Sequence, residues 1–147
     1  MAYNVSHKLQ GNIRAVKIAL DYQKGLPVFD EDLGTLQGYA GFGGIKAILY
    51  PYGSTDEWKA NGATKDDLKL QPEMIRFHKL LKENYREQEY KEIIASLRNS
   101  VLTAFYTPEV VPQVVYDVLK QQGITPKRLY EPSAGSGVFI SEAVKVF

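Results

Sequence analysis

The segments FYTPEVV (residues 105–111) and YEPSAGSGVF (residues 130–139) decide the fold that we predict for this 147-residue chain. In the first segment Thr107 is a typical N-cap residue, Pro108 suits the position after it, and Glu109 complements the positive end of a helix. The second segment has the composition of a glycine-rich turn. Together they predict a helix start and a tight loop that lie about one short helix apart.

The helix that starts at Pro108 is predicted to carry one broad apolar face. Its apolar residues recur in pairs four positions apart, as in a helical stripe; they are Val110, Val111, Val114, Val115, Val118 and Leu119. Pro112 fits this helix poorly, because a proline removes a backbone hydrogen bond one turn from the start. Gly123 is a typical C-terminal cap and is expected to end the helix.

A strand and a second helix are predicted to follow. RLYE (128–131) is a short candidate strand, PSAGSG (132–137) is a tight loop, and VFISEAVKVF (138–147) opens a helix. Helix, strand, glycine loop and helix is the order in which a Rossmann-like domain begins. The predicted fold class is therefore α/β, with the start of a Rossmann-like domain at residues 105–147.

Residues 1–104 are predicted to form a mainly helical N-terminal region. Apolar residues recur at helical spacing over 6–23, over 72–85, which begins with a proline, and over 90–101. The polar stretch 53–66 contains two glycines and is typical of a surface loop. No segment of this region shows the alternation of a strand.

Composition sets few limits on the function. The chain has 18 Lys and Arg against 17 Asp and Glu, so its net charge does not indicate a nucleic acid or a membrane as partner. Cysteine is absent from the sequence, which excludes disulfides and thiolate metal sites and is compatible with a reducing cytoplasm. No apolar run approaches the roughly 20 residues that span a bilayer. We therefore predict a soluble, cytoplasmic protein without a membrane partner.

The glycine loop does not have the pattern of a nucleotide-phosphate site. Gly135 and Gly137 let the backbone turn sharply and approach a ligand, and the N–H groups at the following helix start favour an anion. The dinucleotide pattern, however, needs glycine where Ile140 stands. A P-loop needs a Lys-Ser/Thr pair where Val138 and Phe139 stand.

Glu131 indicates a different kind of ligand. A carboxylate next to a pyrophosphate would be repelled, whereas one next to an ammonium group would be attracted. A ligand with both an anionic and a cationic group suits such a loop, and S-adenosylmethionine carries a carboxylate, an amine and a sulfonium. A strand-to-helix turn that binds nothing explains the loop alone equally well.

Read together, FYTPEVVPQVVYDVL (105–119) and LYEPSAGSGVF (129–139) resemble the start of the amino-type, N6-adenine-specific DNA methyltransferases. In that family a Thr-Pro helix start precedes the first strand and an EPxxGxGxF loop, and the two segments together hold S-adenosylmethionine. The resemblance implies that Tyr106, Thr107 and Pro108 line the methionine end of a cofactor pocket.

The same resemblance assigns roles to the loop. It implies that Glu131 binds the methionine amine, directly or through water, and that Phe139 packs beneath the loop. The residues that it places against the cofactor are Pro132, Ser133, Ala134, Gly135, Ser136 and Gly137.

The upstream segment LQGYAGFGGIKAILY (36–50) is similar to the YVGWGG segment of large methylase–helicase proteins of bacterial mobile elements, such as plasmids and conjugative transposons. There a helical region leads into the same two motifs. The GFGG run (41–44) can be a ligand-contacting loop with Phe42 stacked on a ligand. It can also be a helix-to-helix turn with Phe42 in the core, and we favour the turn.

One expected motif is missing. Methyltransferases of this kind use an Asn/Asp/Ser-Pro-Pro-Tyr/Phe loop to hold the target amine and to stack on the flipped base, and the sequence contains no Pro-Pro pair. The chain also stops inside the second predicted helix. We therefore interpret it as the N-terminal fragment of an S-adenosylmethionine-dependent adenine N6 DNA methyltransferase, inactive alone and without catalytic residues of its own. Its expected partners are DNA and a C-terminal helicase or target-recognition domain.

Two alternatives stay open. Methyltransferases that act on RNA or on protein glutamine share the glycine loop, and a non-catalytic helical interaction module with a vestigial cofactor loop is not an enzyme at all. Of the remaining residues, His7 and His78 have no partner at metal-ligand spacing, so we predict no metal site and a packing role for His78. Trp58, on a polar stretch, is expected to be hard to bury. Lys79, Lys82 and Arg86 belong to a mixed-charge helix face for which contact with a DNA backbone is the less favoured role.

Overall fold

The computed structural model describes residues 4–103, 107–135 and 137–147, and in these ranges every regular element is a helix. The predicted α/β class is therefore wrong for this chain, and residues 128–131 form no strand. The physical reason is the lack of a partner. A strand satisfies its N–H and C=O groups only through a neighbouring strand, and the described residues contain no second strand for the first to pair with.

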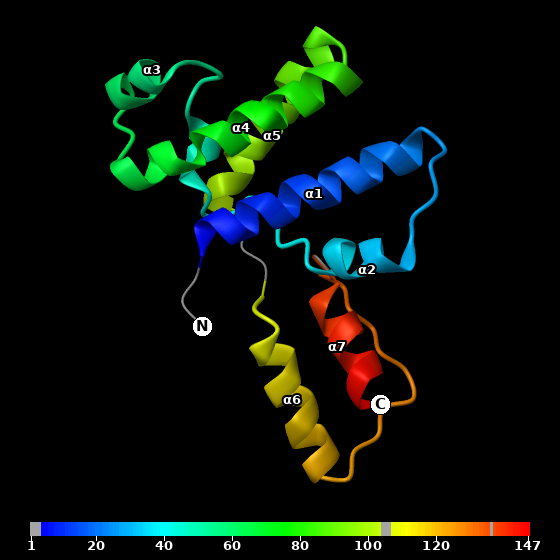
Figure 1. Cartoon of the computed structure of the whole chain (residues 1–147). Helices are drawn as coiled ribbons and strands as arrows, with labels where there is room; N and C mark the ends of the chain where they lie inside the picture. Colours follow the sequence, from blue (N-terminus) through cyan, green and yellow to red (C-terminus); the bar gives the residue numbers. More distant parts are fainter. Residues whose placement is uncertain (1–3, 104–106, 136) are drawn as a thin grey trace. The chain divides into compact units, whose positions relative to one another are not determined.

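The chain divides into two compact units, Met1–Phe105 and Tyr106–Phe147, one residue beyond the boundary that the sequence suggested. The first unit contains helices α1 (Val5–Gln23), α2 (Asp30–Gln37), α3 (Thr55–Ala60), α4 (Lys65–Asn84) and α5 (Glu87–Thr103), with the 3₁₀ helix η1 (Lys46–Leu49) between α2 and α3. The second contains α6 (Val110–Gln121) and α7 (Val138–Val146). Figure 1 labels the α-helices of both units.

The first unit has a well-developed apolar core. Helices α1, α4 and α5 and the η1 segment surround it, and Phe42 stacks on Phe77 with 5.2 Å between ring centroids. The buried members are Leu9, Phe42, Ile45, Ala47, Ile48, Tyr50, Trp58, Leu70, Met74, Phe77, Leu81, Tyr90, Ile94 and Val101. Phe42 thus lies in the core, as we predicted for the GFGG turn.

A buried asparagine holds that turn against α1. The side-chain amide of Asn12 donates to the Gly41 carbonyl at 2.6 Å and accepts from the Ala40 N–H at 3.0 Å. The Lys8 ammonium donates to the Gly43 carbonyl at 2.8 Å. Because each side chain satisfies backbone groups of the turn, the GFGG run is a structural link between α1 and the core.

The stretch 53–66 is not a surface loop. It forms α3 and the start of α4, and each helix begins with a capping box, Ser54 with Glu57 and Thr64 with Asp67. Trp58 is only 1 % exposed, and its indole N–H donates to the Pro51 carbonyl at 2.8 Å.

The predictions of a surface loop over 53–66 and of a poorly buried Trp58 were wrong because α3 is polar on all but one side. The capping pattern was the only local signal of the two helix starts. It also moves the start of α4 to Lys65, so Pro72 lies inside that helix rather than at its first position.

His78 packs in the core of the first unit, as predicted. It is 2 % exposed, and its Nδ1 lies 2.7 Å from the Tyr90 hydroxyl. Its ring also packs against Tyr52, with 5.1 Å between ring centroids. Burial, and to a lesser extent the positive charges of Arg98 and Lys82, lowers the pKa of His78 to about 4.

In the second unit, α6 starts later than the sequence suggested. Thr107 is not its N-cap; Glu109 is, and no side chain caps the helix. The later start makes Pro112 the third residue of the helix. The first turn has no intrahelical acceptor for its N–H groups, so a proline there removes no hydrogen bond. Gly123, with φ of 70°, follows the end of the helix as predicted.

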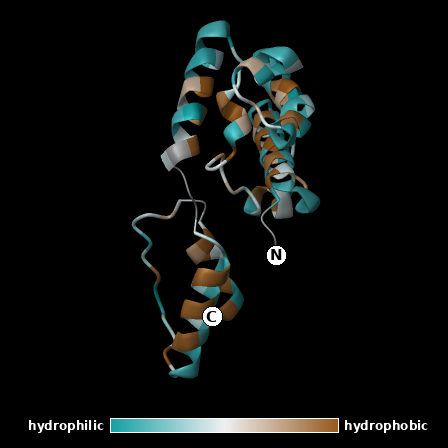
Figure 2. Cartoon of the chain, turned by 90° about the vertical axis from the view of Figure 1, so that its left-hand side faces the viewer, coloured by the Kyte–Doolittle hydropathy of each residue, from teal (hydrophilic) through white to brown (hydrophobic). Residues whose placement is uncertain are grey.

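The valines of α6 do not form the packed face of that helix. Val110, Val114 and Val118 are 59, 56 and 51 % exposed, whereas Pro112 and Tyr116 are buried. Figure 2 shows that apolar residues make up much of the ribbon of the two helices in this unit. The helical periodicity was real, but α7 packs against a different side of α6.

Candidate cofactor-binding loop

Helices α6 and α7 run in the same direction, and the connection between them returns along the unit (Figure 1). The Tyr116 hydroxyl donates to the Phe139 carbonyl at 2.9 Å, and the Tyr116 ring meets the Phe139 and Phe147 rings edge-on. The Gln113 amide donates to a Glu142 carboxylate oxygen at 2.9 Å. The starts of α6 and α7 therefore lie at the same end of this unit, and these contacts hold the pair together.

The turn into α7 depends on two glycines in the left-handed region. Gly135 has φ of 54° and Gly137 has φ of 77°, a conformation that residues with a Cβ rarely adopt. Gly137 is the N-cap of α7, so no side chain caps this helix. The first N–H groups of a helix have no acceptor within it. Among the described residues no side chain caps those of α7, and such groups favour an anionic partner.

The Glu131 carboxylate makes a hydrogen bond within the loop itself. One carboxylate oxygen accepts the Ser133 N–H at 2.8 Å, which closes a small turn at the start of the loop. Glu131 is half-buried, while Pro132, Ser133 and Ala134 are exposed. The Glu131 charge also acts on Tyr116 of α6. Burial is the main cause of the raised pKa of the Tyr116 phenol, and the Glu131 carboxylate is the second cause.

The other predicted cofactor residues lie around these features. Thr107 and Pro108 are exposed immediately before α6, Gly135 is exposed in the loop, and Phe139 is half-buried on α7. Phe139 thus packs on Tyr116, close to the loop. Tyr106 and Ser136 lie outside the described residues.

Sequence reasoning missed the residues that join the two helices. Glu142 is 2 % exposed although it is charged; it accepts from Gln113 and pairs with Lys145 one turn along α7. These two partners, Lys145 first, lower the pKa of the Glu142 carboxyl. The spacing of Glu142 and Lys145 is visible in the sequence, but nothing there identifies Gln113 or Tyr116 as partners from another helix.

An apolar hollow of about 270 Å³ lies on the same unit, between α7 and the segment 126–129. Tyr116, Leu129, Ile140, Val144 and Phe147 contribute its apolar surface. It lies beside the α7 helix and not at its start, so it does not include the glycines of the loop.

Neither a metal cluster nor a membrane span is found in the part of the chain that the structure describes. No three or more of its His, Asp or Glu side chains are grouped so that they could hold a metal ion. None of its helices combines the length and the apolar character needed to cross a membrane.

Comparisons with models of known protein families, with curated proteins and with solved structures find no match to this chain.

Proposed function

We propose that the unit Tyr106–Phe147 binds the methionine end of S-adenosylmethionine, as the cofactor-holding part of a cytoplasmic adenine N6 DNA methyltransferase. The observation that carries the proposal is the loop before α7: two left-handed glycines lead into an uncapped helix start, with a carboxylate a few residues upstream. The start of α6, which Thr107 and Pro108 precede in the chain, lies at the same end of the unit as the start of α7.

The charges of this loop match an amino-acid zwitterion. The uncapped N–H groups at the start of α7 favour the methionine carboxylate. Glu131 uses one oxygen to accept the Ser133 N–H, and the carboxylate keeps acceptor capacity for an ammonium group. A purely anionic ligand would be repelled by Glu131, and a purely cationic one by the helix start.

In such an enzyme most of the catalysis is positioning. The donor is held so that its sulfonium methyl lies in line with the adenine amine. None of the residues of this chain is assigned a catalytic role, so the catalytic groups must come from a further part of the enzyme. The partners in this proposal are DNA and a further domain, either a helicase or a target-recognition domain. We expect the chain alone to bind the donor without transferring its methyl group.

Isothermal titration of the whole chain with S-adenosylmethionine tests the proposal. We expect saturable heat from the native sequence and none from Gly135→Val, because a residue with a Cβ is strained at φ of 54° and would change the turn. Gly123→Val is the matched control: it places the same side chain at a left-handed glycine of the same unit, with φ of 70°, outside the loop. Equal binding by both variants, or no binding by the native chain, would contradict the proposal.

One observation favours a second function, that of a helical module that docks a helicase or a conjugation protein. The exposed valines of α6 form an apolar stripe of the kind that marks interaction sites. The same titration separates the two functions, since a docking module needs no cofactor. The stripe then predicts that Val114→Asp weakens docking while Gly135→Val leaves it unchanged.

A further inference from the structure

A groove of about 950 Å³ in the first unit has a basic lining without any carboxylate. One wall is a single side of α1, from Asn4 to Arg14, and the other is the second half of α2, from Gly34 to Gly38. The ionisable side chains that line it are His7, Lys8 and Arg14. In a chain with nearly equal numbers of basic and acidic residues, a lining of this kind is a local departure from the average.

Two glycines that line the groove widen it, and close packing of the helices does not require either of them. Gly11 lies inside α1 and Gly34 inside α2, where glycine is among the least favourable residues. A Cβ at either position would meet nothing within 4 Å. The two glycines therefore leave open space beside the basic side chains instead of bringing the helices together.

Beyond Arg14 the surface is of mixed charge. On the side of α2, Arg14 and Lys17 share a hollow with Asp21 and Asp32. A second hollow shares Gln10 and Arg14 with the groove and adds Lys17, Arg76 and Lys79. Glu73 and Glu83 also line this hollow, Arg76 is paired with Glu73, and Lys17 is paired with Asp21. Within the described residues, neither Arg14 nor Lys79 has a carboxylate within the 4.0 Å limit of an ion pair.

The length of this surface fits a polymer better than a single anion. At a rise of 1.5 Å per residue, Lys8 and Arg14 lie about 9 Å apart along α1. One strand of a DNA duplex carries a phosphate about every 3.4 Å along the axis, so this stretch spans about three phosphates. A lone phosphate would meet only one of the cations.

We propose that the groove between α1 and α2 binds the phosphodiester backbone of a nucleic acid, with Arg14 as its central contact. Lys8 holds the Gly43 carbonyl and contributes charge at one end, and Lys79 extends the surface at the other. No base-reading side chain is assigned, so this binding is independent of sequence. The first unit carries this site by itself, so it does not depend on the proposed cofactor loop.

Fluorescence anisotropy with labelled oligonucleotides, single-stranded and duplex, tests the proposal on the whole chain. Between about 50 and 200 mM salt, we expect the logarithm of the association constant to fall with log salt with a slope of about −2 to −3. Arg14→Glu is expected to weaken binding about tenfold and to reduce that slope by about one. The two oligonucleotides then show which form of the backbone fits better.

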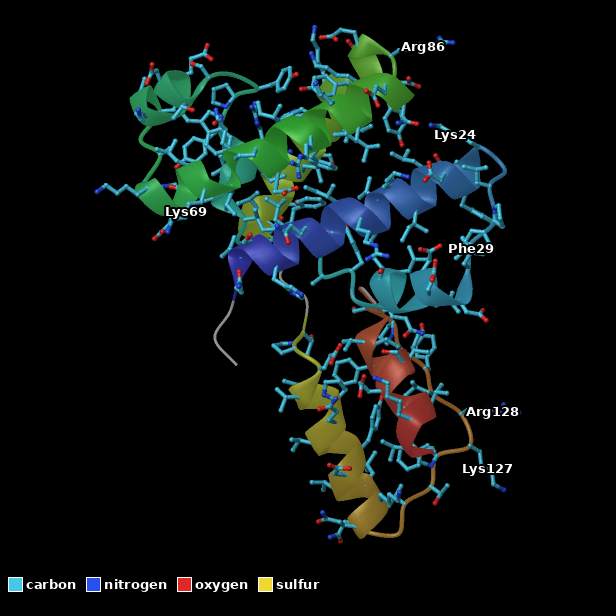
Figure 3. All side chains as sticks on the ribbon, in the orientation of Figure 1. Lys24, Phe29, Lys69, Arg86, Lys127 and Arg128 are labelled. Carbon is cyan, nitrogen blue, oxygen red and sulfur yellow. The ribbon has the colours of Figure 1, made fainter. Side chains whose placement is uncertain are left out.

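The matched control is Lys69→Glu. Lys69 is exposed near the start of α4, which Figure 3 shows at the opposite end of that helix from Arg86, and it lines neither the groove nor the second hollow. We expect this equal change of charge to leave oligonucleotide binding within about twofold of the native value, and Arg14→Glu to leave the S-adenosylmethionine titration unchanged. Equal losses from both variants, no binding of either oligonucleotide, or equally tight binding of inorganic phosphate or polyglutamate would overturn the proposal.

Discussion

The two units of this chain bury their apolar residues to very different extents. In Met1–Phe105, aromatic and aliphatic side chains from five elements meet in one core, and the polar groups of the GFGG turn are satisfied by α1. In Tyr106–Phe147, one tyrosine and a proline are the buried residues of α6, and its valines stay exposed. The first unit therefore has the contacts to be stable alone, while the second has only a helix pair to support its loop.

The largest expected effect tests the core of the first unit. Phe77 is 1 % exposed and stacked on Phe42, so Phe77→Ala is expected to lower the free energy of unfolding by about 3 to 5 kcal/mol. Urea denaturation followed by circular dichroism measures it. Phe29→Ala, at an exposed phenylalanine of the same unit, is the control and is expected to cost less than about 1 kcal/mol. Similar losses from both would show that the core is not where the structure places it.

The pH dependence of stability tests the same core through His78. The pKa of His78 is lowered to about 4 from an ordinary value of 6.5, because burial disfavours its charged ring. Between these two pH values the unfolded chain binds a proton that the folded chain does not. The free energy of unfolding is therefore unaffected by protonation of His78 above pH 6.5. It falls by about 3 kcal/mol as the pH decreases to about 4.

Denaturation at a series of pH values measures this loss. The ring faces Tyr52, Tyr90, Lys82 and Arg98, and the two cations oppose its protonation further. His78→Gln removes the titrating group, so we expect its stability curve to be flatter than that of the native chain in this window. Parallel curves would contradict the buried, neutral histidine.

A smaller effect is expected where the second unit is held together. Tyr116→Phe removes the hydrogen bond to the Phe139 carbonyl and should cost about 1 kcal/mol locally. Hydrogen exchange of the α7 amides should then be about fivefold faster. Tyr130→Phe is the control, since Tyr130 is 88 % exposed, and it should leave exchange unchanged. If Tyr116→Phe also leaves it unchanged, another contact holds the helix pair.

The smallest expected effect concerns the exposed stripe of α6. Val114 is more than half exposed, so Val114→Ser is expected to change the free energy of unfolding by less than about 0.5 kcal/mol. Urea denaturation again measures it, with Tyr116→Phe as the comparison within the same helix. A loss of 2 kcal/mol or more would show that the valine stripe is covered in solution, for instance by a second copy of the chain.

The helices were predictable wherever apolar residues repeat at helical spacing. The stripe predicted over 6–23 is α1, from Val5 to Gln23, and the stripe over 90–101 lies within α5. The spacing alone was sufficient because a long amphipathic stripe fits no other regular structure. Helix α3 was not predicted, because only Trp58 of this short helix is buried and one apolar residue makes no repeating pattern.

The candidate loop was predictable in its local geometry and not in its surroundings. Two glycines before a helix indicated a sharp backbone turn, and Gly135 and Gly137 make it in the left-handed region. Tyr116, Gln113 and Glu142, which join the two helices around that loop, gave no signal of their contacts in the sequence. Those contacts join residues more than twenty positions apart, and local patterns carry no information about such pairs.

By itself, the sequence indicated the long amphipathic helices, where glycines turn the chain and which charges lie next to the loop, because propensity and φ preferences are local. Only the tertiary structure decided which face of each helix is buried. The valines of α6 have the spacing of a packed face, yet Tyr116 is the side chain that packs. It also decided that residues 128–131 form no strand, since a strand exists only through the hydrogen bonds of a neighbour.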